Sequence, residues 1–215
     1  MVRDLDIPPP ERLHFPGPAG QLAATYERPA REPHAAVLHL HPLTTHGGNR
    51  RNNVVRHGAL GSLEAGCAAL RMDFRGAGDS EGEYDEGVGE LADAMAGLRW
   101  LQERLPGRPV FVWGFSFGSR VGLEFVQRNP ELAAGYLGVA WPTEYYDWPD
   151  AGPWPERAAF LAGTADGFVD FDKMGPAHEH GAVTLLDGAG HFFPGRLDAV
   201  RAWTADALKG WLQGL

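Results

Sequence analysis

The chain has 215 residues, 44% of them hydrophobic, which is enough for one compact domain, residues 1–215, with a sizeable core. A formal net charge of −9 argues against nucleic acid as a partner. The apolar runs are no longer than strands, and the first ten residues are charged and rich in proline. We therefore expect no signal peptide, no membrane partner and a cytoplasmic location. A single cysteine, Cys67, excludes a disulfide framework and fits a reducing compartment.

Strands and helices are predicted to alternate along most of the chain. Residues 11–15 and 22–27 flank a turn rich in proline and glycine and predict an N-terminal antiparallel hairpin. Buried strands are predicted at 35–40 and 67–74, and further strands at 110–113, 134–141, 158–163 and 183–186. Helices are predicted at about 52–65, 90–104, 117–128 and 197–212. This alternation predicts an α/β fold, a doubly wound, mostly parallel sheet with helices on both faces. Reactive residues gather at the carboxyl ends of the strands in such sheets.

The motif G-x-S-x-G occurs twice, around Ser80 and around Ser116. Ser116 follows a predicted strand directly and opens a helix, whereas Ser80 lies in a polar loop. A serine at a strained strand-to-helix corner needs neighbours without a Cβ atom, which explains the glycines two residues to either side of Ser116. We predict Ser116 as a nucleophile, with the N–H of Phe117 directed at an oxyanion. A serine that only caps the helix is the alternative.

A serine nucleophile requires a base, and three histidines follow Ser116 in the chain. His191 lies in a turn of small residues after the strand at 183–186, where reactive residues are expected. His178 and His180 are typical of a solvated helix end. The sequence therefore predicts His191 as the base.

An imidazole base in turn needs a carboxylate that holds its tautomer and stabilises the imidazolium. Asp166 lies just past the predicted strand 158–163, and we predict it as the acid because of that position. Asp170 and Asp172 in the following turn are the alternatives. A second oxyanion donor is expected from the loop after the strand 35–40, where Pro42 has no N–H, so the N–H of Leu43 is predicted.

Five segments carry a family resemblance. They are His41-Pro42 with Gly47-Gly48, Asp73 to Ser80 (DFRGAGDS), Gly114 to Gly118 (GFSFG), Gly163 to Asp166 (GTAD) and Gly190 to Phe193 (GHFF). In this order they resemble the α/β-hydrolase superfamily, and more narrowly its small, cap-less bacterial members. The resemblance covers roughly residues 22–211 and implies a Ser-Asp-His triad, a hydrolase without a cofactor and a structural turn role for residues 73–80.

Larger members of this superfamily often insert a helical cap where this chain has only residues 142–156, so no large cap is expected. This segment contains four prolines and four large aromatic residues, Tyr145, Tyr146, Trp148 and Trp154. One interpretation is that the four aromatic residues form a wall of the substrate pocket beside Ser116. The other is that they cover the end of the sheet or a contact in a homodimer.

Two rival functions differ in kind from a serine hydrolase. His39 and His41 are two residues apart on a predicted strand, and with His46 they could bind a metal, but no carboxylate or cysteine with ligand spacing accompanies them. We therefore predict no metal. A binding protein that retains a hydrolase fold is the other rival. The sequence favours a serine esterase for small acyl substrates, and peptidase or thioesterase activity stays open because it uses the same residues.

Overall fold

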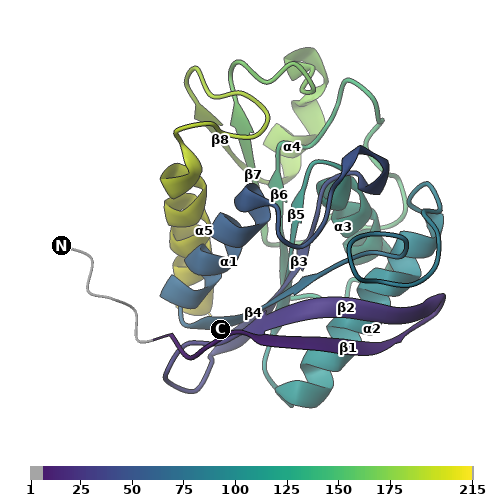
Figure 1. Cartoon of the computed structure of the whole chain (residues 1–215). Coiled ribbons are helices and arrows are strands. Elements are labelled where there is room, and N and C mark those ends of the chain that lie inside the picture. The colour runs from purple at the N-terminus through teal and green to yellow at the C-terminus, as the bar shows by residue number, and fades with distance from the viewer. Residues whose placement is uncertain (1–6, 215) are drawn as a thin grey trace.

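An eight-stranded sheet runs through the part of the chain that the structure, a computed structural model, describes, residues 7–214 (Figure 1). The strand order is β1-β2-β4-β3-β5-β6-β7-β8. The strands are β1 (Glu11–Gly17), β2 (Gly20–Glu27), β3 (Ala35–Leu40), β4 (Cys67–Met72), β5 (Val110–Phe115), β6 (Gly135–Val139), β7 (Ala158–Gly163) and β8 (Ala182–Leu186). The β1–β2 and β2–β4 pairs are antiparallel and all other pairs are parallel, which confirms the mostly parallel sheet and the N-terminal hairpin.

Helices cover both faces of the sheet, as predicted (Figure 1). The helices α1 (Asn53–Glu64) and α5 (Leu197–Leu212) pack on one face, and α2 (Val88–Arg104) and α3 (Phe117–Arg128) pack on the other. The short helix α4 (Gly175–His180) precedes β8. Among the described helices, none combines the length and apolar character that a membrane span requires.

The core has two layers because the side chains of each central strand alternate between the two faces. In β3, Ala36, Leu38 and Leu40 pack toward α2 and α3, whereas Ala35 and Val37 pack toward α1 and α5. Every residue of β3, β4, β5, β6 and β7 is buried, as the continuous apolar runs in the sequence indicate for strands covered on both faces.

Two predicted strands end earlier in the structure. The strand predicted at 67–74 ends at Met72, and directly after it the carboxylate of Asp73 pairs with Arg50. The strand predicted at 134–141 ends at Val139, because Ala140 takes the left-handed conformation, with φ of 49°. Both ends lie at the carboxyl edge of the parallel strands, where the chain turns into the loops that form the candidate site.

No helix lies between β6 and β7 in the structure. Residues 140–157 cross this edge of the sheet as turns and extended chain. The prediction that the fold has no large cap is therefore confirmed.

Candidate active site

Ser116 occupies the sharp corner between β5 and α3, with φ of 55° and ψ of −121°. A residue with a Cβ atom adopts such a conformation only where the surroundings impose it. A Cβ atom on Gly114 would clash with the carbonyl of Gly118, and one on Gly118 would clash with the carbonyls of Leu40 and His41. The two glycines of the motif therefore let β5, α3 and the end of β3 approach closely, as the sequence predicted.

Ser116, His191 and Asp166 form one chain of hydrogen bonds. Nε2 of His191 lies 2.9 Å from Oγ of Ser116, and Nδ1 lies 2.8 Å and 3.0 Å from the two carboxylate oxygens of Asp166. All three residues are buried, yet Ser116 and His191 line a cavity. Because the carboxylate can only accept, Nδ1 carries the proton and Nε2 is free to accept the proton of the serine hydroxyl.

Cross-links between two neighbouring turns hold Asp166 and His191 at this distance. The N–H of Ala165 donates to Ala189 O at 2.9 Å, and the N–H of Gly188 donates to the hydroxyl of Thr164 at 2.8 Å. The turn after β7 is thereby joined to the turn after β8. In addition, the N–H of Phe168 donates to Oδ1 of Asp166 at 2.9 Å, which leaves the carboxylate little freedom to rotate.

The alternative acids lie elsewhere. Oδ1 of Asp170 accepts the N–H of Asp172, and Oδ2 of Asp170 is 3.6 Å from Nζ of Lys173. Among residues 7–214, the only carboxylate within hydrogen-bond distance of His191 is that of Asp166.

The alternative base and nucleophile residues also lie outside the hydrogen-bonded chain. His178 and His180 are exposed on α4, as expected for a solvated helix end. The hydroxyl of Ser80 donates to Asp73 O and accepts from the N–H of Ala23, both at 2.9 Å, so it fixes a turn.

The backbone N–H groups of Leu43 and Phe117 have no hydrogen-bond acceptor within residues 7–214, and both residues line the same cavity as Ser116. Phe117 is the first residue of α3, so its N–H also carries the positive end of the helix dipole. Two unpartnered donors beside a serine hydroxyl are the arrangement that can hold a developing oxyanion.

His41 holds the loop that carries Leu43. Its Nδ1–H donates to Pro42 O at 2.6 Å and its Nε2 accepts from the N–H of Phe74 at 3.0 Å, so the ring must be neutral. Burial lowers the pKa of His41 to about 4. The N–H of Gly48 closes the loop by donating to Leu43 O at 3.0 Å. The sequence singled out His41 only as part of a motif and as a possible metal ligand.

The predicted common face for His39 and His41 is wrong, because β3 ends at Leu40 and the alternation of the strand does not extend to His41. His39 bonds instead to the hydroxyl of Ser62 on α1, with Nε2 and Oγ 3.0 Å apart. Among the residues that the structure describes, no three His, Cys, Asp or Glu side chains are grouped closely enough to hold a metal ion.

A cavity of about 660 Å³ opens above Ser116. It is lined by Pro42, Leu43, His46, Gly47, Gly48, Asn52, Ser116, Phe117, Pro142, Tyr145, Tyr146, Phe168, His191 and Phe192. Two of the four predicted pocket residues, Tyr145 and Tyr146, are in this lining. Phe168 and Phe192 also line it and were not predicted. Their positions, two residues after Asp166 and directly after His191, are the signal that could have identified them.

Trp148 and Trp154 were predicted as pocket residues, and the structure corrects this. Trp148 stacks on Trp141 with 4.1 Å between ring centroids, and its Nε1–H donates to Lys173 O. Trp154 stacks on His180, and both Trp148 and Trp154 pack against Phe160 of β7. These two residues cover the sheet, as the alternative interpretation proposed.

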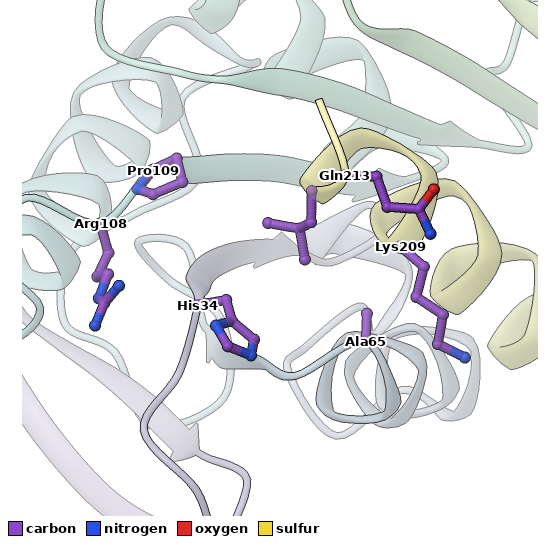
Figure 2. Close-up of a pocket in the computed structure, with 7 residues that line it drawn as sticks. His34, Ala65, Arg108, Pro109, Lys209 and Gln213 are labelled. Carbon is purple, nitrogen blue, oxygen red and sulfur yellow. The ribbon is translucent and has the colours of Figure 1, made fainter. Parts of the chain in front are cut away.

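Figure 2 shows a second cavity, of about 530 Å³, at the opposite edge of the sheet. It lies between the residue that precedes β5, Pro109, and the ends of α1 and α5. Within the described chain its lining includes His34, Arg108 and Lys209 but no serine, cysteine or carboxylate. It therefore contains no serine or cysteine nucleophile.

Comparison with known proteins identifies the family. The model of the family described as alpha/beta hydrolase fold matches residues 43–173. The chain belongs to the α/β-hydrolase fold family. Its relatives include the protein named uncharacterized protein RP471 of Rickettsia prowazekii, which is 34% identical over 197 residues, covering 85% of this chain and 82% of that protein.

Among solved structures of this family, XC6422 of Xanthomonas campestris is similar, with a TM-score of 0.86 and 27% identity over 94% of both chains. It is described as an α/β serine hydrolase without a lid. Lysophosphatidylserine lipase ABHD12 of Danio rerio is 36% identical over 107 residues, but the match spans only 49% of this chain and 27% of that protein. The α/β-hydrolase fold and its serine hydrolase relatives support hydrolase activity for this chain.

Proposed function

We propose that the protein is a serine hydrolase that cleaves carboxylic ester bonds of small acyl substrates through Ser116, His191 and Asp166. The observation that carries this proposal is the hydrogen-bonded chain from Oγ of Ser116 through His191 to Asp166 at the floor of an open cavity. A serine hydroxyl becomes a nucleophile only beside a base, and the base works only when a third group orients it.

The geometry supports acyl transfer in two halves. Oγ of Ser116 attacks the ester carbonyl carbon while Nε2 of His191 takes the hydroxyl proton, and the N–H groups of Leu43 and Phe117 hydrogen-bond the oxyanion. When the tetrahedral intermediate collapses, the bond from carbon to the alcohol oxygen breaks and Nε2 returns the proton to that oxygen. Water then attacks the acyl-enzyme, with His191 again as base, and releases the acid and Ser116.

Asp166 serves as the fixed negative charge in this scheme. Its carboxylate is buried and accepts both the N–H of Phe168 and the Nδ1–H of His191, so it is placed to stabilise the imidazolium. It holds the reactive tautomer without taking a proton itself.

Three observations favour an ester over other acyl substrates and over a binding role without chemistry. The cavity is open and has no cap over it. The partial relative ABHD12 is named a lipase, an enzyme that cleaves esters. The two unpartnered N–H groups beside Ser116 are the donors that the oxyanion of acyl transfer requires.

The test combines a fluorophosphonate probe with two serine variants. The probe should label Ser116 in the wild-type protein, and Ser116→Ala should lose both labelling and about 10⁴-fold or more in kcat for 4-nitrophenyl acetate. Ser80→Ala is the matched control, because Ser80 occupies the other G-x-S-x-G motif and fixes a turn. It should keep most of the activity once thermal denaturation shows that it is folded. Equal losses in the two folded variants, or no labelling of the wild type, would contradict the proposal.

A further inference from the structure

Exposed aromatic rings are concentrated around the cavity that contains Ser116. The exposed large hydrophobic side chains among the described residues are Val88, Tyr145, Phe168, Phe171, Leu185 and Phe192. Three of them, Tyr145, Phe168 and Phe192, line the cavity, and we call these three residues the aromatic rim. Their exposed fractions are 63%, 41% and 56%. Apolar surface left in water at the mouth of a cavity is typical of a binding site.

The aromatic rim lies against the imidazole of His191. The ring of Phe168 stacks on that of His191, with 4.3 Å between centroids and 26° between planes. The ring of Phe192 stands perpendicular to His191 at 5.1 Å, and Tyr145 is 5.6 Å from Phe168. The rim therefore flanks the base, His191.

This position decides which part of an ester the rim meets. In the proposed mechanism the alcohol oxygen receives its proton from Nε2 of His191 and must lie within hydrogen-bond distance of it. The carbon chain attached to that oxygen then passes the rings that flank the imidazole. The carbonyl oxygen, by contrast, must lie toward the N–H groups of Leu43 and Phe117.

The geometry points to a site for the alcohol part of the substrate: the aromatic rim selects uncharged alcohols that carry an aromatic ring. This inference rests on the proposed esterase function and adds its substrate class. Aromatic rings gain from offset or edge-to-face contact with one another beyond the area they bury, and a saturated ring of the same size does not. The alcohol is uncharged because the fourteen residues that line the cavity include no lysine, arginine, aspartate or glutamate to pair with a charge.

The test compares 2-phenylethyl acetate with 2-cyclohexylethyl acetate, with hydrolysis followed by acid release at constant pH. The two esters form the same acetyl-enzyme, and the ring lies two carbons from the reacting oxygen, so their intrinsic reactivities are closely matched. We expect kcat/KM to favour the phenyl ester by about 5-fold, the range for one or two aromatic contacts. If hydrolysis of the common acetyl-enzyme is the slowest step, we expect kcat to be nearly equal for the two esters.

Variants of the rim make the test specific. Phe168→Leu and Phe192→Leu should each lower the phenyl-to-cyclohexyl ratio of kcat/KM toward 1. If the substitution only disturbed His191, it would change kcat/KM for both esters by the same factor. The ratio of the two kcat/KM values within one variant cancels such a change. Phe171→Leu is the matched control, because Phe171 is also exposed but does not line the cavity, and it should keep the wild-type ratio.

A second pair of esters tests the assignment to the alcohol side. Methyl 3-phenylpropanoate and methyl 3-cyclohexylpropanoate place the ring on the acyl part, and their kcat/KM values should differ little. A preference confined to this pair, or a ratio near 1 for the acetate pair in an active enzyme, would overturn the inference and leave the esterase function standing. No hydrolysis of any of the four esters by folded wild-type protein would overturn the proposed function itself.

Discussion

The carboxylate of Asp166 differs from the neighbouring carboxylates in what it contacts. Both of its oxygens lie within hydrogen-bond distance of Nδ1 of His191, and one also accepts the N–H of Phe168. The carboxylate of Asp170, by contrast, accepts the N–H of Asp172 in its own turn and lies 3.6 Å from Nζ of Lys173. A buried carboxylate that must orient an imidazole and a carboxylate that caps a turn should respond very differently to the same substitution.

We therefore expect Asp166→Asn to fold and to lose roughly 10⁴-fold in kcat, because the amide leaves the imidazole in the wrong tautomer. A loss of that size is the precedent for the same substitution in a serine protease. Asp170→Asn should stay near the wild-type rate. Kinetics with 4-nitrophenyl acetate on variants of matched thermal stability measure both effects. A crippled Asp170→Asn beside a nearly normal Asp166→Asn would reverse the assignment.

The sequence predicted those site residues whose place in the fold is set by the end of a strand. Ser116 comes directly after the buried strand β5, and Asp166 and His191 lie in the turns after β7 and β8, so the topology of the sheet brings all three to one edge. Trp148 and Trp154 could not be separated from Tyr145 and Tyr146 in this way. All four lie in an irregular segment without periodicity, and which ring faces the cavity depends on tertiary contacts with Trp141, Phe160 and His180.

The loop between β3 and α1 depends on an uncharged histidine. Because Nε2 of His41 accepts the N–H of Phe74, protonation would break this bond and place a charge in a fully buried site. The folded-state pKa of about 4 lies below the ordinary value of 6.5. Between these two values the unfolded chain binds a proton that the folded chain does not.

It follows that the contribution of His41 to stability is complete above pH 6.5 and is lost as the pH falls toward 4. A shift of this size corresponds to about 2 kcal/mol less free energy of unfolding at pH 5 than at pH 8. Urea denaturation of the wild type and of His41→Gln at both pH values should show a smaller pH dependence in the variant. An equal difference in the free energy of unfolding between pH 5 and pH 8 in both proteins would show that His41 does not titrate in this way.

The predicted elements agree with the structure because the apolar runs and helix stops in this chain are unambiguous. Ala35–Leu40, Ala158–Gly163 and Leu197–Leu212 have the predicted bounds. The strand predicted to reach residue 74 ends at Met72, and the buried pair of Asp73 with Arg50 follows directly after it. Such a pairing between distant residues leaves no mark in a local pattern of hydrophobicity.

For the whole molecule, the decisive feature is that, among the described residues, no helical cap lies over the carboxyl edge of the sheet. With only residues 140–157 between β6 and β7 and no helix in them, nothing encloses a long acyl chain. A groove that buried each added CH₂ would raise kcat/KM about fourfold per carbon. We expect instead that kcat/KM for 4-nitrophenyl esters stays level or falls from the butanoyl to the dodecanoyl ester.

Rates measured across the solubility limit of the longer esters complete this test. No jump in rate should accompany the formation of a lipid–water interface, because there is no lid to displace. A steady rise in kcat/KM with chain length, or a jump at the interface, would reveal a binding surface beyond the cavity described above.

The same openness bears on what becomes of the acyl group after the first alcohol has left. Water is not the only nucleophile that can reach an acyl-enzyme in a cavity without a cover. In the proposed mechanism each step is reversible, so a small alcohol that occupies the place of the departing one can accept the acyl group from Ser116. The choice between hydrolysis and synthesis of a new ester in this mechanism therefore depends on the concentration of water relative to that of the alcohols that the aromatic rim accepts.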